Sequence, residues 1–163
     1  MKIYITGAPG SGKTTLAREI SRITGIKCHH LDEVMHEKDP ENPGGNRKRE
    51  PEARDRLFRE IISGESWIIE DAGRACFREG QERANCIVIL DFPKPFLIFR
   101  VTSRHIKQLL GIEKAQYKAD MSMFRAMHKW VFEYDLNAHI FCPEKAVFLK
   151  NKRDMAAFIS RFI

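Results

Sequence analysis

Near its start the chain reads Gly7-Ala8-Pro9-Gly10-Ser11-Gly12-Lys13-Thr14, which satisfies the Walker A pattern G-x-x-x-x-G-K-[ST] at every constrained position. Glycines at both ends of such a loop allow successive backbone N–H groups to converge on an anion. The Lys13 ammonium can then reach the β- and γ-phosphates of a nucleotide, and the Thr14 hydroxyl can bind the Mg²⁺ that bridges them. The stretch therefore predicts a phosphate-binding loop with Mg²⁺ as a cofactor.

The segments on both sides of this loop fit the interpretation. Residues 2–6 are a short run rich in β-branched side chains, and residues 13–24 carry Leu16, Ile20 and Ile23 at helical spacing. The loop is thus expected to join a strand to a helix, which is the context that the pattern requires. A glycine-rich turn without function is the alternative, and the flanking elements argue against it.

The rest of the chain alternates between apolar runs and segments with helical periodicity. Further strands are expected at residues 26–31, 67–69, 86–90 and 146–149, and further helices at residues 51–63, 93–110, 120–137 and 154–163. The run 86–90 lacks alternation, so we expect it to be the central strand, buried on both faces. The order predicts an α/β fold of three layers, with a five-stranded parallel sheet and helices on both faces, in a single domain over residues 1–163.

Acidic residues follow two of the expected strands. Asp32 comes after the second strand, and Glu70 and Asp71 come after the third. Because ligands of open parallel sheets bind at the carboxyl ends of the strands, Asp32 could meet an acceptor hydroxyl or a magnesium water, or it could cap the next helix. One of Glu70 and Asp71 could hold Mg²⁺ through water, and Arg74 could bind a phosphate. The alternative is an exposed loop whose charges pair with each other.

Two polar segments are candidates for parts that close over a ligand. Residues 35–50 are irregular, and we expect a mobile flap or loop there. The flap ends in three adjacent cations that could close on an anionic acceptor or form a solvated face, namely Arg47, Lys48 and Arg49. Residues 105–119 are expected to form a short lid. The helix leading into it has three cations on one side, which suit a lid over phosphates or a solvated surface, namely Arg100, Arg104 and Lys107.

The chain has a formal net charge of +6 and a sequence pI of about 9.3. A nucleic-acid partner and a polyphosphate ligand would each explain this excess of Lys and Arg. No helix-turn-helix, zinc-finger or aromatic–basic pattern is present in the sequence, so nucleic acid is not the favoured partner. The sequence has no apolar run of about eighteen residues and enters the first strand directly. We therefore expect no membrane span, no signal peptide and a cytoplasmic location.

Two further patterns were weighed for chemistry. Cys28-His29-His30 followed by Asp32 could suggest a metal cluster, but a short strand running into a polar loop explains it better. The stretch Asn151-Lys152-Arg153-Asp154 fits the guanine-reading pattern N-K-x-D. A guanine reader should be followed by a further strand, whereas one helix follows here. We therefore expect ATP rather than GTP as the nucleotide.

With these features in place, the order of motifs resembles small nucleotide kinases of the adenylate kinase group, and within it the adenylate-kinase-related proteins labelled DNA topology modulation (FlaR-like) proteins. The residues that carry the resemblance are the phosphate loop with Ser11 and Thr15, His30-Leu31-Asp32, residues 65–69, residues 83–91, Arg100 to Arg104, Asp120-Met121 and Trp130. The resemblance covers roughly residues 1–135 and implies a P-loop NTPase fold of the nucleotide kinase type.

The resemblance also implies roles for individual residues. The donor ATP would be held by Gly7, Ala8, Pro9, Gly10, Ser11, Gly12, Lys13, Thr14 and Thr15. Lys13 would stabilise the transferring phosphoryl group and Asp32 would face the acceptor, while Arg74, Arg100 and Arg104 would neutralise charge on the acceptor and the γ-phosphate. The sequence departs from the group at Glu70-Asp71, where Asp-Gly is usual, so either acid could serve Mg²⁺. The lid is also short, with Gln108 and Lys114 where more arginines are usual.

The function predicted from the sequence is ATP-dependent phosphoryl transfer, with Mg²⁺, to a small-molecule acceptor that is a nucleotide or nucleoside. Transfer of this kind needs positioning and charge neutralisation more than covalent chemistry, which fits a loop, a lid and a few arginines. The alternative is a nucleotide-dependent protein that binds DNA or modulates its topology with little kinase activity. Nothing in the sequence indicates an oligomeric state.

Overall fold

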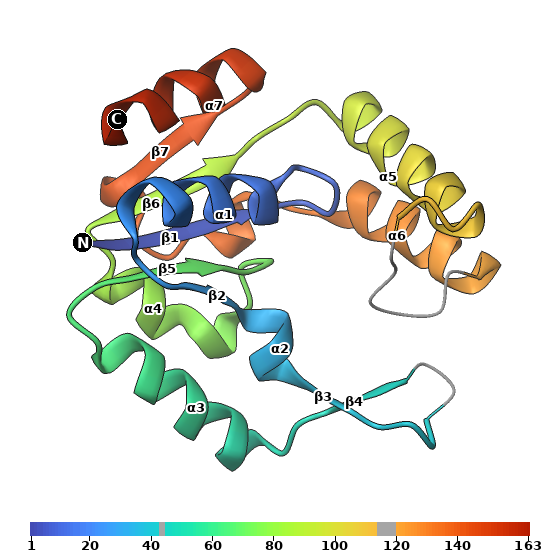
Figure 1. Cartoon of the computed structure of the whole chain (residues 1–163), viewed down its shortest axis with the longest axis horizontal. Coiled ribbons are helices and arrows are strands. Elements are labelled where there is room, and N and C mark those ends of the chain that lie inside the picture. Colours follow the sequence, from blue (N-terminus) through green and yellow to red (C-terminus); the bar gives the residue numbers. More distant parts are fainter. Residues whose placement is uncertain (43–44, 114–119) are drawn as a thin grey trace.

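A five-stranded parallel sheet forms the centre of the computed structural model, which describes residues 1–42, 45–113 and 120–163 (Figure 1). In spatial order the strands are β2 (Cys28–His30), β5 (Trp67–Glu70), β1 (Lys2–Gly7), β6 (Cys86–Leu90) and β7 (Ala146–Leu149). The expected parallel sheet is confirmed. The expectation that residues 86–90 are central is wrong by one place: β1 is the middle strand, and β6 lies between β1 and β7.

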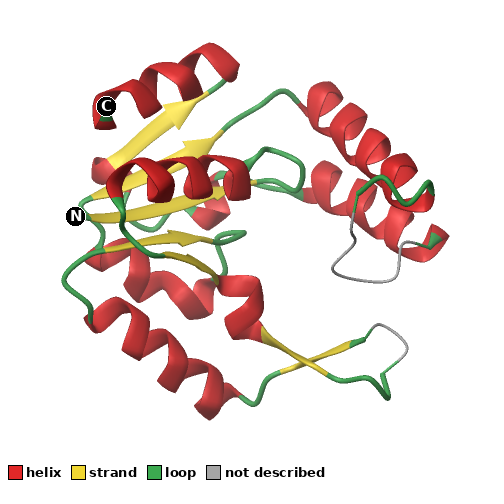
Figure 2. Ribbon diagram, in the orientation of Figure 1, coloured by secondary structure: helices red, strands yellow, loops and turns green. Residues whose placement is uncertain are grey.

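Helices cover both faces of this sheet, as Figure 2 shows. On one face lie α1 (Lys13–Thr24) and α7 (Lys152–Ile159), and on the other lie α2 (Leu31–Met35), α3 (Pro51–Ser63) and α4 (Arg78–Arg83). Strand β1 supplies both cores, because alternate side chains of a strand point to opposite faces. Ile3 and Ile5 pack on the α1 side and Tyr4 on the α3 side, each at most 2% exposed.

The helices α5 (Lys94–Leu109) and α6 (Met121–Glu133) pack together and project beyond the carboxyl ends of the strands (Figure 1). Asp120 caps α6 as predicted, because its carboxylate accepts hydrogen bonds from the backbone N–H groups of Ser122 and Met123. The helix ends at Glu133 rather than near residue 137. Of the lid expected over residues 105–119, the first part continues α5 to Leu109, and residues 114–119 lie outside the described residues.

The segment expected to be an irregular flap forms a hairpin instead. Strands β3 (His36–Lys38) and β4 (Asn46–Lys48) pair antiparallel and form a second, two-stranded sheet. Glu37 lies opposite Arg47 in the register, and the Nε of Arg47 donates to Glu37 Oε1 at 2.7 Å. This cross-strand ion pair favours regular pairing over the irregular loop expected from the Pro and Gly content.

Several short 3₁₀ elements complete the described chain: η1 (Ala75–Phe77), η2 (Asn137–His139), η3 (Pro143–Lys145) and η4 (Ser160–Phe162). The elements η1, η2, η3, α2 and α4 were not expected from the sequence, because each is too short to show a clear periodicity. The helix expected over residues 154–163 is observed as α7, which begins at Lys152, followed by η4. Over residues 1–42, 45–113 and 120–163, no helix combines the length and apolar character needed to cross a bilayer.

Candidate functional site

The glycine-rich loop lies between β1 and α1, as predicted, and its backbone is held close to α5. Gly10 and Gly12 have φ angles of 78° and 101°, which only glycine adopts without strain. A Cβ on Gly10 would lie 2.9 Å from Val101 Cγ2, and one on Gly12 would lie 3.2 Å from Arg100 Nη1. Both glycines are therefore required by the backbone conformation and by the close approach of α5.

The side chain of Lys13 turns back over the loop. Its Nζ donates hydrogen bonds to the carbonyl oxygens of Gly7, at 2.9 Å, and Ala8, at 3.1 Å. Burial lowers the pKa of this ammonium, and the nearby Glu70 and Asp32 carboxylates oppose that shift. The positive charge thus sits inside the loop that is predicted to hold phosphates.

Arg100 lies against the same loop. Its Nη1 donates to the carbonyl oxygen of Ser11 at 3.4 Å, and its guanidinium carbon lies 5.7 Å from the centre of the Phe96 ring. The pKa of Arg100 is lowered, mainly by burial and to a smaller extent by the positive charge of the neighbouring Arg104. Arg104 is half exposed, and its Nε lies 3.1 Å from Glu113 Oε1. The structure thus places Arg100, which was predicted to neutralise charge on the acceptor and the γ-phosphate, beside the phosphate loop.

Glu70 faces the start of α1. The Thr14 hydroxyl donates to Glu70 Oε1 at 3.1 Å, and His30 Nδ1 lies 2.9 Å from the same oxygen. The pKa of His30 is raised to about 10, through its contacts with Cys28 and with Glu70, so its ring is an imidazolium at neutral pH. The other oxygen, Glu70 Oε2, is buried and has no hydrogen-bond partner within the described part of the chain.

Asp71 has a different environment from its neighbour. Its side chain is 0% exposed, and its Oδ2 accepts hydrogen bonds from the Tyr4 hydroxyl and from the backbone N–H groups of Gly73 and Arg74. Its Oδ1 pairs with Arg74 Nη1. Glu70 and Asp71 point in opposite directions because neighbouring residues of an extended chain alternate between its two faces. These contacts hold the loop after β5 in place and tie it to β1.

Arg74 connects the acidic residues that follow β2 and β5. One end of its guanidinium pairs with Asp71, and the other end, Nη2, pairs with Asp32 Oδ1. Asp32 lies in the first turn of α2, directly after β2, and its side chain is 63% exposed. The two residues predicted to bind the acceptor, Asp32 and Arg74, are therefore in direct contact at the carboxyl edge of the sheet.

His30 is a site residue that sequence reasoning did not assign to any role. It stands directly opposite Glu70 in the pairing of β2 with β5. The strand expected over residues 26–31 is confirmed but shorter, because β2 covers only Cys28–His30 and Leu31 begins α2. The pairing itself could not be read from the chain, because it needs the strand order, in which β5 is inserted between β1 and β2.

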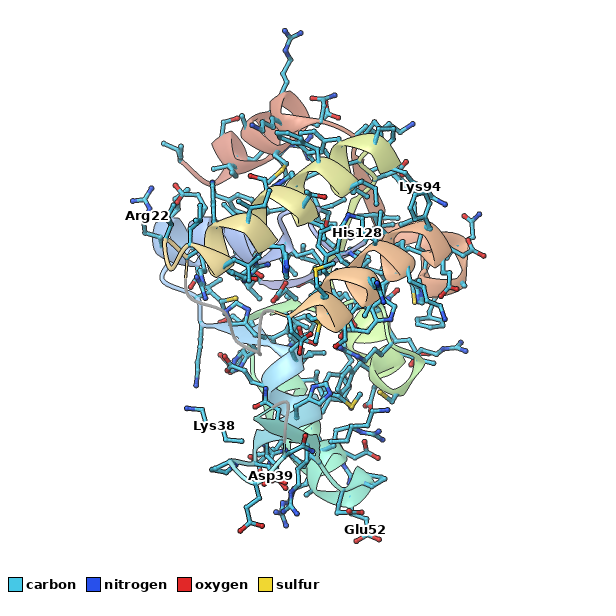
Figure 3. All side chains as sticks on the ribbon, turned by 90° about the vertical axis from the view of Figure 1, so that its right-hand side faces the viewer. Arg22, Lys38, Asp39, Glu52, Lys94 and His128 are labelled. Carbon is cyan, nitrogen blue, oxygen red and sulfur yellow. The ribbon has the colours of Figure 1, made fainter. Side chains whose placement is uncertain are left out.

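The cations of the expected flap are largely paired. Glu37 accepts from Arg47 and also from Arg49 Nη1, at 3.0 Å. Arg49 further donates to the carbonyl oxygen of Val34 at 3.1 Å, so it ties the hairpin to α2. Figure 3 faces this side of the molecule and shows Lys38 at the hairpin below and His128 on α6 above. The hairpin and the α5–α6 pair thus border the carboxyl edge of the sheet from opposite sides.

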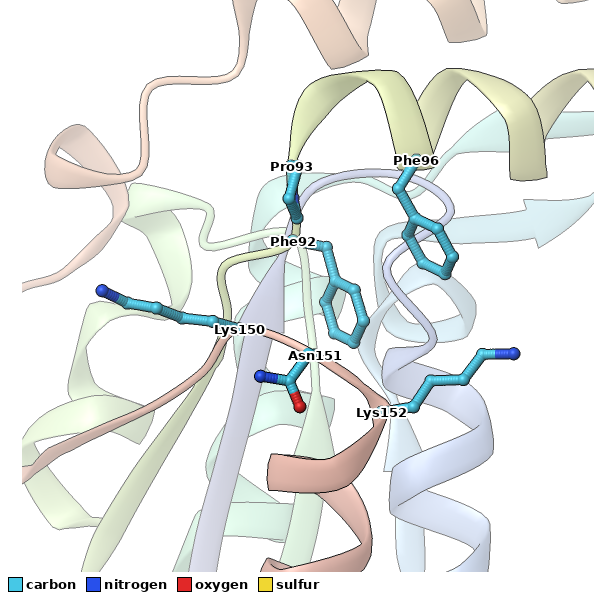
Figure 4. A pocket seen from close by; sticks show the side chains of 6 residues that line it. All are labelled: Phe92, Pro93, Phe96, Lys150, Asn151 and Lys152. Carbon is cyan, nitrogen blue, oxygen red and sulfur yellow. The ribbon is translucent and has the colours of Figure 1, made fainter.

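A hollow of about 330 Å³ lies between the start of α5 and the loop after β7 (Figure 4). Its lining residues are Phe92, Pro93, Phe96, Lys150, Asn151 and Lys152. The rings of Phe92 and Phe96 stack with their centres 5.2 Å apart. Phe96 also contacts Arg100, and Arg100 in turn contacts the phosphate loop. Arg100 therefore connects this aromatic hollow to the loop.

The N-K-x-D letters have a structural role at the start of α7. The Asn151 side chain accepts a hydrogen bond from the Asp154 backbone N–H at 3.0 Å, which makes Asn151 the N-cap. Asp154 Oδ2 accepts from Asn151 Nδ2 and from the backbone N–H of Lys150. The spacing of Asn and Asp is therefore explained by helix capping.

The parallel sheet, the glycine-rich loop between β1 and α1 and the helices on both faces define the P-loop kinase class of α/β fold. The sequence match agrees with this class: residues 3–118 fit the model of the AAA domain family, and the chain belongs to that family. A comparison with curated protein sequences gives no match.

Solved structures of several kinases have a similar fold. A shikimate kinase from Bacteroides thetaiotaomicron has a TM-score of 0.58 at 18% identity, over 99% of this chain and 95% of its own. A sugar kinase from Janibacter sp. HTCC2649 has a TM-score of 0.55 at 19% identity, over 98% and 90% of the two chains. A gluconokinase from Sinorhizobium meliloti 1021 has a TM-score of 0.55 at 16% identity, over 98% and 91%. These similarities confirm the predicted fold class.

Proposed function

We propose that the protein transfers the γ-phosphoryl group of ATP to a hydroxyl group of a small molecule. The observation that carries this proposal is the convergence of Thr14 and Glu70 beside Lys13 in the phosphate loop. In the reaction, a bond forms between the acceptor oxygen and the γ-phosphorus while the bond to the ADP oxygen breaks. The hydroxyl proton passes to a carboxylate, for which Asp32 is the candidate.

The residues at the loop fit a magnesium ion. Mg²⁺ prefers oxygen ligands, and the Thr14 hydroxyl and the Glu70 carboxylate offer them side by side. The buried Glu70 Oε2 lacks a hydrogen-bond partner among the described residues, as a carboxylate oxygen reserved for a ligand would. When bound, Mg²⁺ would neutralise charge on the β- and γ-phosphates. We assign this role to Glu70 rather than Asp71, because the Asp71 carboxylate is already bonded to Tyr4 of β1 and to Gly73 and Arg74 of its own loop.

Other coordinating side chains are few. In the described ranges no group of three or more His, Cys, Asp or Glu side chains is arranged to hold a metal ion. Phosphate and water oxygens would therefore complete the shell, which is the usual arrangement for Mg²⁺ in phosphotransferases.

The positions of two cations and of the aromatic hollow suggest where the donor nucleotide binds. Lys13 and Arg100 lie on the loop that would hold the phosphates, and Phe96 connects Arg100 to the hollow lined by Phe92 and Asn151. An apolar, aromatic hollow suits a nucleobase. We propose that this hollow takes the base of ATP and that Arg100 acts on the donor phosphates. Arg104 stays a predicted catalytic residue.

The resemblance to FlaR-like proteins supports the same class of phosphate-loop site, and a direct role on DNA stays a prediction. The names of the similar structures, a shikimate kinase, a gluconokinase and a sugar kinase, support a small hydroxyl-bearing acceptor for this chain too. A DNA-binding role would instead predict an affinity for DNA that falls steeply with salt concentration.

The test is ADP release from Mg·ATP with a panel of nucleosides, nucleoside monophosphates, sugars and small hydroxy acids. At least one acceptor should raise ADP release well above the rate with water, and Lys13→Ala should lower that rate at least about 100-fold. Lys27→Ala removes an exposed lysine outside the site and serves as the matched control. If nucleotide binds and no acceptor in the panel is phosphorylated, the kinase proposal is wrong.

A further inference from the structure

The cations on the two sides of the site are compensated differently. On the donor side, Lys13 and Arg100 donate to the backbone carbonyl oxygens of Gly7, Ala8 and Ser11. Within the part of the chain that the structure describes, neither cation is within ion-pair distance of a carboxylate. Carbonyl oxygens carry no formal charge, so neither cation is held by a direct ion pair and both can contact an anionic ligand.

On the acceptor side, the guanidinium of Arg74 is held between two carboxylates. Its Nη1 pairs with Asp71, which is fully buried, and its Nη2 pairs with Asp32, which is mostly exposed. One guanidinium and two carboxylates carry a formal charge of −1. Both ends of the fork with which an arginine binds a phosphate are therefore already in use.

A phosphate monoester is poorly matched to such a cluster. It carries a charge of about −1.5 to −2 near neutral pH and would approach the exposed carboxylate of Asp32. To reach Arg74 it would have to displace Asp32, and Asp71 would still compensate the guanidinium. A neutral molecule with neighbouring hydroxyl groups can instead donate hydrogen bonds to Asp32 without disturbing the pair.

We propose that the acceptor is an uncharged polyhydroxy molecule, with a free sugar or an unphosphorylated nucleoside as its source, and that Asp32 binds its hydroxyl groups. This inference rests on the proposed phosphotransferase function. It narrows the acceptor predicted from the sequence, which included nucleotides.

The experiment compares matched pairs: each nucleoside with its 5′-monophosphate and each free sugar with its phosphate ester. ADP release and product mass are measured with Mg·ATP, and binding to the protein with ADP present is measured by ligand-observed NMR. We expect at least one uncharged member to exceed its phosphorylated partner by about tenfold or more in kcat/KM and to bind more tightly. The members that respond identify the source as sugar or nucleoside.

The second part of the experiment uses the variant Asp32→Asn. It should lower kcat for the uncharged acceptor about 100-fold, with the KM for ATP within about threefold, because the variant keeps the donor loop. It should also tighten the binding of the phosphorylated partner, because one end of Arg74 is released. Glu33→Gln is the matched control, since Glu33 is an exposed acid in the same first turn of α2.

The outcomes separate this inference from the proposed function. A monophosphate that is phosphorylated in preference to its uncharged partner overturns the inference and leaves the kinase function in place. Absence of any phosphorylated product overturns the kinase function, and the binding arm then still decides the inference. If the phosphorylated members bind more tightly, or if no uncharged member binds, the inference of an uncharged acceptor is wrong.

Discussion

The side of the site proposed to hold the donor and the side proposed to hold the acceptor are built in different ways. The phosphate loop is one continuous stretch of backbone, and its cations contact carbonyl oxygens. The acceptor side is assembled from side chains of β2, α2, β5 and the loop after β5, and its arginine lies between two carboxylates. A backbone cradle leaves its positive charge available for a ligand, whereas a cluster of side chains compensates its own charges. Four measurements test this difference between the two sides.

The largest effect is expected at Glu70, where the two sides meet. Glu70→Gln should lower turnover by about 100- to 1,000-fold, because it removes a charged ligand proposed for Mg²⁺. Binding of a non-hydrolysable ATP analogue, measured by calorimetry, should lose most of the gain in affinity that Mg²⁺ confers on the wild type. Affinity in the presence of EDTA should stay within about threefold. An unchanged Mg²⁺ dependence would show that Glu70 does not hold the ion.

Asp71 should matter for stability rather than for Mg²⁺. Asp71→Asn weakens a buried ion pair and the hydrogen bonds to Tyr4 and Gly73, so we expect the free energy of unfolding in urea to fall by about 3 kcal/mol. Asp55→Asn breaks a more exposed pair with Arg54 and should cost less than about 1 kcal/mol. If Asp71→Asn is as stable as the control and loses its Mg²⁺ dependence, the assignment of the two acids is reversed.

The close approach of α5 to the loop predicts a smaller effect. Gly10→Ala places a Cβ 2.9 Å from Val101 at a positive φ, so it should destabilise the fold by about 2 kcal/mol and weaken ADP binding. Gly25→Ala has a similar φ of 70° with nothing within 4 Å, so only the backbone strain remains, about 1 kcal/mol. Thermal unfolding and ADP titration measure both variants. Equal losses in the two would mean that packing against α5 contributes nothing.

A pH-dependent effect concerns His30, whose ring contacts Cys28 and Glu70. Contacts with Cys28 first and Glu70 second raise the folded-state pKa of His30 from 6.5 to about 10, so these contacts stabilise the fold fully below pH 6.5 and lose that contribution as the pH rises toward 10. The difference in unfolding free energy between the wild type and His30→Gln should therefore shrink from about pH 6 to about pH 9, measured in urea with a reductant present. A difference that is constant over this range would contradict the ion pair.

Much of the fold could be predicted from the sequence. Helices α1 and α3 and strands β6 and β7 have the predicted bounds, because amphipathic spacing, Pro51 and continuous apolar runs are local signals. The hairpin at residues 36–48 and the short α2 and α4 were missed. The hairpin depends on the contacts of Glu37 with Arg47 and Arg49, which join positions ten or more residues apart.

The candidate site divides in the same way. The loop from Gly7 to Thr14 could be predicted because the residues that fix its geometry are consecutive and belong to one strand–loop–helix unit. The tertiary structure decided which of Glu70 and Asp71 faces Thr14, that Arg74 is shared by two carboxylates, and that Arg100 lies on the donor loop. Those relations depend on strand order, on the alternation of side chains along β5 and on the position of α5. They join residues from distant parts of the chain, so no local pattern could contain them.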